Sequence, residues 1–169
     1  MRLETDTTIS GVRCAPTGRA KAAVFASGRL AACPLASDTV IAQHRFEART
    51  WIYLTDAGAL RAVWLNRDTE LQGHLCKGTG YKGWSTEFHH AGTLKLCYPA
   101  REMIIDGVPC RGASFWAELL GITQVEFHEG GQLRSCSVAR EIDRDGIHFR
   151  KRDRIELDER GRVAKGSLG

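Results

Sequence analysis

The sequence predicts an all-β fold, an antiparallel meander of about five hairpin repeats of roughly 30 residues each, in an open or closed sheet. Three observations support this expectation. Segments of the chain align with one another without gaps, short stretches have the patterning of strands, and glycine recurs at fixed positions. The segment 113–122 is the one candidate helix, and it is short. We therefore expect a single β-repeat domain over residues 1–169.

The internal repeat is the first of these observations. Four segments of 20 residues align without a gap, namely 27–46, 57–76, 91–110 and 130–149. This frame places units near 11–42, 43–72, 73–106, 107–145 and 146–169, with a half unit at 1–10. A single hairpin is only marginally stable in water, so neighbouring units must pack together to complete a core.

Each unit contains a strand that ends in an apolar residue, and a glycine follows four residues later. The strand ends are Val24, Leu54, Phe88, Phe127 and Leu157, and the glycines are Gly28, Gly58, Gly92, Gly131 and Gly161. A Leu or Val comes two residues after each glycine. This spacing suits a type I turn with a G1 bulge, where glycine adopts a positive φ without a steric penalty.

An acidic residue marks a second bend, eight positions after the Leu that follows each of the first four of these glycines. The acids are Asp38, Asp68, Glu102 and Glu141. A carboxylate at such a position can accept hydrogen bonds from turn amides. A second glycine closes most units, at Gly73, Gly107 and Gly146, whereas Gln43 occupies this position in the second unit.

Composition sets the broad class of protein. The chain has 169 residues, a net charge of +4, 43% hydrophobic and 26% charged residues, as expected for one globular domain. Acidic residues are interspersed among the basic ones, so we expect no nucleic-acid partner. The sequence has no apolar run of about 18 residues that would span a membrane, and residues 1–11 lack the apolar segment of a secretory signal.

The six cysteines follow the repeat. One position holds Cys14, Cys76 and Cys110, a second holds Cys33, Cys97 and Cys136, and the two positions gain and lose cysteine together. This joint occupancy favours three disulfides, Cys14–Cys33, Cys76–Cys97 and Cys110–Cys136. The alternative is three pairs of reduced, buried thiols that act as small hydrophobic side chains. Phe and Val occupy the same positions in other units, which agrees with this alternative. Disulfides would place the protein outside the cytoplasm, and thiols inside it.

The stretch 77–84, Lys-Gly-Thr-Gly-Tyr-Lys-Gly-Trp, contains the glycine spacing of a dinucleotide-binding turn. That turn must lead into a helix, whereas these glycines lead into a predicted strand at 84–88. Between the first cysteine position and the strand end the units use 8, 8, 10, 12 and 17 residues. We therefore interpret the glycines as part of a loop insertion and expect no nucleotide or other cofactor.

The longest insertion, 112–123, carries several large apolar side chains. Apolar loops of this kind either cap a core or contact a partner. The candidate binding residues are Phe115, Trp116, Leu119 and Leu120, together with Tyr81 and Trp84 of the loop 77–84. The neighbouring positions of successive units would bring these two loops together.

No catalytic or metal-binding pattern stands out. His89, His90 and His128 follow the strand ends, and His44 shares a position with His74, so the repeat itself accounts for them. The spacings of zinc sites, of serine hydrolases and of phosphate-binding loops are missing from the sequence. We expect the protein not to be an enzyme and to bind no metal.

The unit pattern F-H-x-x-G-x-L-x-x-C-x-x-A-R-E-x-x-x-D-G resembles the β-hairpin repeats of uncharacterised bacterial repeat proteins. More distantly it resembles MORN-type repeats, although the Tyr/Trp-Gly core of a MORN unit is missing and these units are longer. The resemblance implies scaffolding, membrane association or protein binding, and no functional residue is carried over from it.

Two functions follow as expectations. The first is a non-enzymatic binding or structural module, possibly stapled by disulfides, that presents loops 77–84 and 112–123 to an unknown protein or surface partner. The alternative is an intracellular interaction protein with reduced cysteines, either a neutraliser of a partner protein or a scaffold at a membrane surface. An enzyme whose site is assembled between loops is the third hypothesis.

Overall fold

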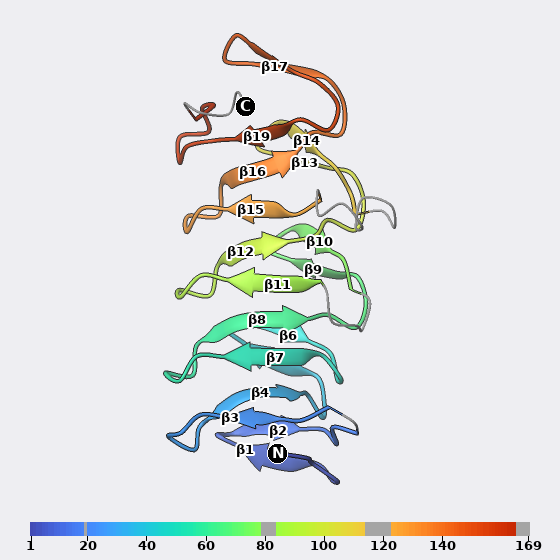
Figure 1. Ribbon diagram of the computed structural model, residues 1–169, viewed down its shortest axis with the longest axis vertical. Helices are drawn as coiled ribbons and strands as arrows, with labels where there is room; N and C mark the ends of the chain where they lie inside the picture. Colours follow the sequence, from blue (N-terminus) through green and yellow to red (C-terminus); the bar gives the residue numbers. More distant parts are fainter. Residues whose placement is uncertain (19, 79–83, 114–122, 165–169) are drawn as a thin grey trace. The chain divides into compact units, whose positions relative to one another are not determined.

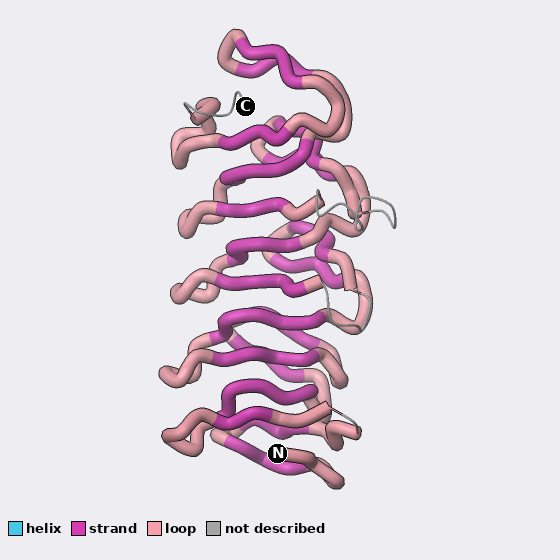
Figure 2. Tube along the Cα trace, viewed as in Figure 1, coloured by secondary structure: helices cyan, strands magenta, loops and turns pink. Residues whose placement is uncertain are grey.

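The computed structural model of the protein describes residues 1–18, 20–78, 84–113 and 123–164. These residues contain 19 strands and no helix, and the strands pair in antiparallel fashion, so the predicted all-β class is confirmed. Each of the first four repeats contributes a short hairpin followed by a longer one, and the fifth contributes a short hairpin and one further strand (Figures 1 and 2). The first repeat comprises β1–β4, the second β5–β8, the third β9–β12, the fourth β13–β16 and the fifth β17–β19. The candidate helix at 113–122 lies outside the described residues, apart from Ala113.

The chain divides into two compact bodies. The N-terminal body contains Met1–Arg67 and Gly78–Gly92, and the C-terminal body contains Asp68–Lys77 and Thr93–Gly169. The third repeat contributes strands to both bodies.

In the N-terminal body, the longer hairpins build a sheet with the strand order β11-β8-β7-β4-β3. Its strands are β3 (Ala23–Val24), β4 (Leu30–Pro34), β7 (Trp51–Leu54), β8 (Leu60–Trp64) and β11 (Ser85–Phe88). The short hairpins are separate two-stranded sheets, β1 (Thr7–Ile9) with β2 (Val12–Cys14), and β5 (Thr39–Ile41) with β6 (His44–Phe46).

The C-terminal body has the same arrangement, with the sheet order β19-β16-β15-β12. The sheet strands are β12 (Leu94–Cys97), β15 (Val125–Phe127), β16 (Leu133–Ser137) and β19 (Arg154–Glu156). The short hairpins are β9 (Thr69–Leu71) with β10 (His74–Cys76), β13 (Met103–Ile105) with β14 (Val108–Cys110), and β17 (Ile142–Arg144) with β18 (Ile147–Phe149).

The turns of the longer hairpins have the predicted geometry. At the β7–β8 turn, the Gly58 amide donates to the Thr55 carbonyl, the Thr55 amide donates to the Ala59 carbonyl, both at 2.8 Å, and Gly58 has a φ of +87°. This is a type I turn with a G1 bulge. The equivalent glycines Gly28, Gly92, Gly131 and Gly161 also have positive φ.

The short hairpins close through a different turn, in which two successive residues have positive φ. Asp106 and Gly107 have φ values of 50° and 79°, as a type I′ turn requires. In the second repeat Ala42 and Gln43 adopt 49° and 65° without a glycine. The backbone therefore keeps the turn even where the sequence departs from the repeat.

The first residue of this turn binds the longer hairpin of its own repeat. Its side chain accepts a hydrogen bond from the amide of the apolar residue that follows the G1 turn. The pairs are Ser10–Leu30 at 3.0 Å, Gln72–Leu94 at 3.0 Å, Asp106–Leu133 at 2.7 Å and Asp145–Val163 at 2.6 Å. We call this contact the turn-to-hairpin bond. Ala42 has no side-chain acceptor to make it.

The recurring acids have mixed roles. Asp38 accepts a hydrogen bond from the Ala48 amide and another from Arg45, both at 3.1 Å, and these bonds lower the pKa of Asp38. This carboxylate serves a bend as predicted. Asp68 and Glu102 instead face basic side chains, Lys77 at 3.8 Å and Arg140 at 4.0 Å.

The core of each body combines the inner side of its sheet with the facing side of its short hairpins. In the N-terminal body Phe46 of a short hairpin and Ile52 and Val63 of the sheet are fully buried. The predicted antiparallel meander is confirmed for the strands of the longer hairpins. Only the longer hairpins enter the sheets, and the short hairpins form separate two-stranded sheets that share the core.

Candidate binding surface

Three aromatic side chains lie on the outer side of β7 and β8. Trp51 and Tyr53 alternate along β7 with the buried residues Ile52 and Leu54, so they point away from the core. Trp64 of β8 is directly opposite Trp51 in the strand register, which places both rings on the same side of the sheet. We call Trp51, Tyr53 and Trp64 the aromatic face.

The rings of the aromatic face touch one another without stacking flat. The ring centroids of Tyr53 and Trp64 are 4.7 Å apart at 59°, and those of Trp51 and Trp64 are 6.1 Å apart at 45°. Each residue is only partly buried. Burial raises the pKa of Tyr53 to about 12, against a smaller opposing effect of the Arg61 charge. The phenol is therefore a neutral hydrogen-bond donor at physiological pH.

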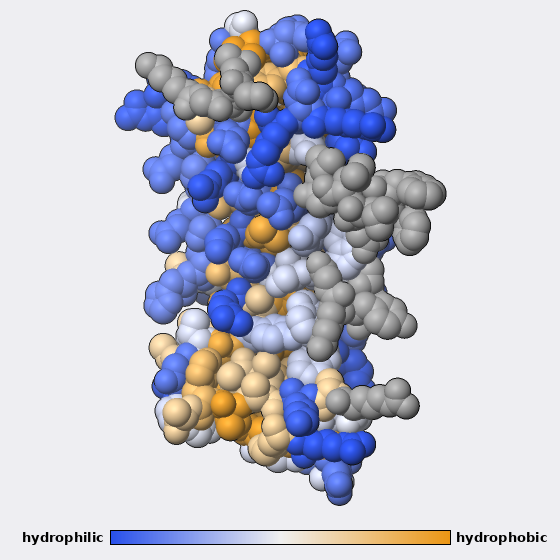
Figure 3. All heavy atoms as spheres, viewed as in Figure 1, coloured by the Kyte–Doolittle hydropathy of each residue, from blue (hydrophilic) through white to orange (hydrophobic). Residues whose placement is uncertain are grey.

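Small residues surround the three rings. Ala32 and Ala62 are the cross-strand neighbours of Tyr53, and Pro34 is the neighbour of Trp51. In Figure 3 hydrophobic and pale side chains gather over β3, β4 and β7. These small neighbours leave the three rings partly exposed on the outer side of the sheet.

The equivalent side of the C-terminal sheet is charged over β15, β16 and β19, whereas β12 places Leu96 there. The Arg154 guanidinium lies 2.9 Å from a Glu126 carboxylate oxygen, 2.6 Å from the Ser135 hydroxyl and 3.5 Å from a Glu156 carboxylate oxygen. Figure 3 shows hydrophilic side chains over β16 and β19. An outer side lined by aromatic rings is therefore a property of particular repeats and not a requirement of the repeat fold.

The loops that the sequence singled out are only partly described. Tyr81, Phe115, Trp116, Leu119 and Leu120 lie outside the described residues, so their assignment to a binding site stays a prediction. Trp84 is described, and its side chain is only 6% exposed. It offers little surface to a partner in this structure, and its assignment to a binding site stays a prediction.

The glycines Gly78 and Gly112, two residues after Cys76 and Cys110, have a structural role. A Cβ atom at Gly78 would overlap the Arg67 backbone, and one at Gly112 would overlap the Arg101 backbone. These glycines permit close approach of two chain segments. A packing reason therefore accounts for the first glycine of the stretch 77–84 without a nucleotide.

The structure brings each predicted cysteine pair together and buries all six side chains. Cys14 and Cys33 form a disulfide, with Cα atoms 5.8 Å apart. Cys76, Cys97, Cys110 and Cys136 are thiols, so the second and third predicted bonds are not formed in this structure. Hydrogen bonding to Cys76 and burial raise the pKa of Cys97, and Cys136 and burial do the same for Cys110.

Three histidines pack between repeats. The Nε2 atom of His44 donates to the Gly92 carbonyl at 2.9 Å, and its ring centroid lies 5.1 Å from that of Phe88. The ring of His74 lies 4.7 Å from that of Phe127, and His128 donates to the Leu157 carbonyl at 2.9 Å. These contacts are structural, in agreement with the interpretation from the repeat.

The described residues contain neither a cluster of metal ligands nor a helix that could span a membrane. Within 1–18, 20–78, 84–113 and 123–164 no group of three or more His, Cys, Asp or Glu side chains could hold a metal ion. The same part of the chain has no helix that is long and apolar enough to cross a membrane. Comparison with protein-family models, with curated proteins and with solved structures found no match.

Sequence reasoning missed the aromatic face, although a signal for it is present. The stretch Trp51–Leu54 is apolar throughout, so it predicts a strand. Without alternation of apolar and polar residues, it does not indicate which side chains are buried. The outward positions of other repeats hold polar residues, such as Glu126 and Glu156. Comparison of outward positions between repeats would have singled out Trp51 and Tyr53, whereas Trp64 has an aromatic counterpart, Tyr98, in the third repeat.

Proposed function

We propose that the protein is a non-enzymatic β-repeat binding module that contacts a partner through the aromatic face of its N-terminal body. The observation that carries this proposal is the position of Trp51, Tyr53 and Trp64 on the side of the sheet opposite the core. Folding does not need large aromatic rings there, since the C-terminal sheet has charged and hydroxyl side chains on that side.

The chemistry of the aromatic face supports binding. Tryptophan and tyrosine are enriched among the residues that dominate binding free energies, because they bury a large area with little loss of side-chain entropy. Tyr53 adds a neutral hydroxyl donor. The predicted loops 77–84 and 112–123 are further candidate contacts.

A double substitution of the face tests the proposal. The variant Trp51→Ser/Trp64→Ser removes two rings from the outer side and leaves Ile52 and Val63 of the core in place. Leu96→Ser is the matched control, because Leu96 is a partly buried outward residue of β12 in the C-terminal body. We expect both variants to fold, as judged by circular dichroism.

Binding is measured by capture from lysate of the source cells and on arrays of glycans and peptides, with competition by unlabelled protein. We expect a saturable partner that wild-type protein and Leu96→Ser retain and that Trp51→Ser/Trp64→Ser loses at least tenfold, as for the removal of interface anchor residues. A partner retained equally by all three proteins would exclude the aromatic face as its binding surface.

The second candidate is an intracellular interaction protein, which the four thiols Cys76, Cys97, Cys110 and Cys136 support, whereas the Cys14–Cys33 bond supports an oxidising compartment. Mass spectrometry of protein whose thiols are alkylated during harvest distinguishes the two. Alkylation of these four residues supports the intracellular role, whereas bonds Cys76–Cys97 and Cys110–Cys136 support a protein that works in an oxidising compartment.

A further inference from the structure

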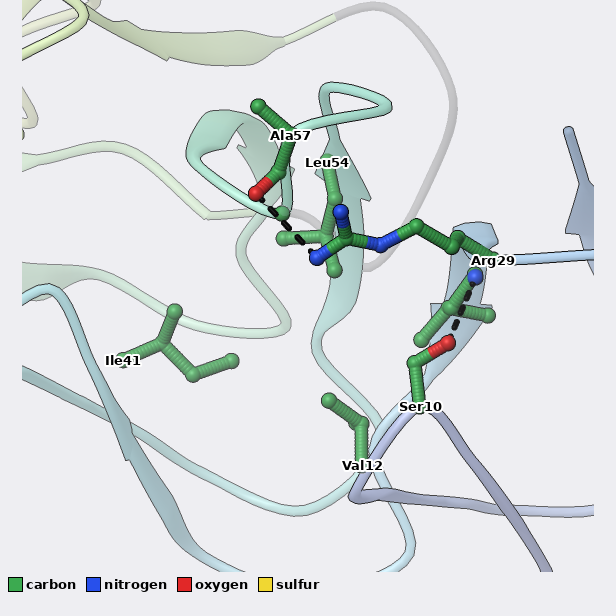
Figure 4. A pocket seen from close by; sticks show the side chains of 8 residues that line it. Ser10, Val12, Arg29, Ile41, Leu54 and Ala57 are labelled. Atoms are coloured by element: carbon green, nitrogen blue, oxygen red, sulfur yellow. Dashed lines mark hydrogen bonds between the residues drawn. The ribbon is translucent and has the colours of Figure 1, made fainter. Parts of the chain in front are cut away.

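A cavity of about 210 Å³ lies between the first and second repeats of the N-terminal body. Its apolar lining comes from Val12, Leu30, Ile41 and Leu54, and its polar lining includes Ser10 and Arg29. Figure 4 shows the apolar side chains around the hollow, with the Arg29 side chain extending across one side of it toward Ala57. The aromatic face shares none of these residues, so the cavity is an independent feature.

The repeat explains why this space exists. Val12 and Leu54 occupy the positions that His44 and Phe88 occupy one repeat later. There the two rings fill the space, 5.1 Å apart, and His44 donates to the Gly92 carbonyl. The third and fourth repeats supply a similar pair in His74 and Phe127. The cavity therefore lies where an aromatic ring packs in the following repeat.

The polar groups at the cavity favour an anion. The Arg29 guanidinium donates to the Ala57 carbonyl at 3.2 Å, and within the described residues it has no ion pair. The carboxylate of Asp56 is bonded to the Ser27 hydroxyl. The Ser10 hydroxyl accepts from the Leu30 amide, which leaves its own proton to donate. A carboxylate here would gain charge-assisted hydrogen bonds from Arg29.

We propose that the cavity binds a monocyclic aromatic carboxylate, with the ring among Val12, Ile41 and Leu54 and the carboxylate at Arg29. The size is suitable, because an apolar cavity of about 150 Å³ is known to accept benzene. The ligand ring takes the place that the His44 ring takes one repeat later. The ligand therefore needs both an aromatic ring for the apolar lining and a carboxylate for Arg29.

The test uses the intact protein and 4-fluorobenzoate as the probe, observed by fluorine NMR. Two reference compounds separate the contributions, 4-fluorobenzyl alcohol with the ring alone and fluoroacetate with the carboxylate alone. We expect saturable binding of 4-fluorobenzoate with a dissociation constant of about 1 mM, as suits a ligand of this size in an open site. Each reference compound should bind at least about tenfold more weakly.

Three variants complete the test. Val12→His/Leu54→Phe fills the cavity with the pair found one repeat later and should abolish binding. Arg29→Ala, the residue that the second repeat has at this position, should weaken binding about tenfold. Arg61→Ala removes another exposed arginine of the same body and should leave binding unchanged. Leu54→Phe alone replaces the double variant if circular dichroism shows that the latter does not fold.

Three results would overturn the proposal. The first is no saturable signal with wild-type protein up to about 10 mM probe. The second is binding to a folded cavity-filling variant that equals wild-type binding, which would place the probe elsewhere. Equal binding to Arg29→Ala and wild-type protein would likewise overturn it, because the carboxylate would then have no part in recognition.

Discussion

The carboxylate of Asp106 accepts a hydrogen bond of 2.7 Å from the backbone amide of Leu133. Asp106 is in the turn of a short hairpin, and Leu133 is the first residue of β16 in the longer hairpin of the same repeat. One side chain therefore joins the two hairpins of a repeat. Ser10, Gln72 and Asp145 make the equivalent bond in three other repeats.

Removal of the Asp106 side chain should therefore destabilise the C-terminal body. We expect Asp106→Gly to lower the free energy of unfolding by about 1 kcal/mol, measured by urea denaturation, because glycine keeps the positive φ but lacks the acceptor. Asp106→Asn is the control, since its amide oxygen still accepts and asparagine tolerates this backbone. Equal stability of the two variants would show that the turn-to-hairpin bond contributes nothing.

Gln43 has a φ of 65° where the other repeats have glycine. A left-handed backbone costs a non-glycine residue about 1–2 kcal/mol. Glycine avoids this cost, but it loses more backbone entropy on folding, which cancels about half of the gain. We expect Gln43→Gly to raise the free energy of unfolding by about 0.5–1 kcal/mol. Gln43→Ala, which keeps the penalty, should bring no such gain, and a gain from alanine would contradict this account.

Gly112 should not tolerate a larger residue. A Cβ atom there would overlap the backbone of Arg101 and Glu102, which cannot move away without disturbing the bend. We expect Gly112→Ala to lower the melting temperature by roughly 10 °C, equivalent to about 2–3 kcal/mol. Gly130→Ala is the control, because its added Cβ would meet only the flexible Gln132 side chain. Similar melting temperatures for both would contradict the close approach at Gly112.

The cysteines should react only after unfolding. All six are buried, and the pKa values of Cys97 and Cys110 are raised, so little reactive thiolate is present in the folded protein. A thiol-specific chromogenic reagent at pH 8 should detect none in native protein and four in denatured, unreduced protein. Six thiols after denaturation would exclude the Cys14–Cys33 bond, and fewer than four would mean that a second pair is oxidised.

Acid should destabilise the C-terminal body through His74. Burial lowers the pKa of His74, and the nearby charge of Asp106 opposes this to a lesser extent. The unfolded chain therefore binds the proton more readily, so the free energy of unfolding falls as the pH drops below about 6.5. His74→Val, with the residue found at this position in the first and fourth repeats, should lessen the loss between about pH 7 and pH 5. An unchanged pH profile would contradict the assignment.

The sequence predicted the features that recur in every repeat. Gly58 and its equivalents gave the turns of the longer hairpins, because positive φ with this spacing has few other causes. The joint occupancy of Cys14 and Cys33 gave correct neighbours, because two buried positions that change together usually touch. These features depend on residues that are close together within one repeat, and the same pattern recurs in several repeats.

Features that depend on the assembled layers could not be predicted in the same way. Nothing in the sequence shows that the short hairpins leave the sheet, since β5 and β7 are both short stretches rich in β-branched and apolar residues. Whether Trp51 points to solvent or to the core depends on which face of the sheet the short hairpins cover. The cavity beside Val12 depends on the position of the His44 ring in the next repeat, which a sequence does not show.

The turn-to-hairpin bond also bears on how such an array could evolve. Its donor and acceptor, the glycines of both turns and the cysteine pair all come from within one repeat. A gene segment that encodes one repeat therefore carries these stabilising features with it when it is duplicated. Loss of both cysteines, as in the second repeat with Phe46 and Val63, then leaves the other repeats unaffected. Such inheritance favours repeats that share a frame and differ in the side chains they present to solvent.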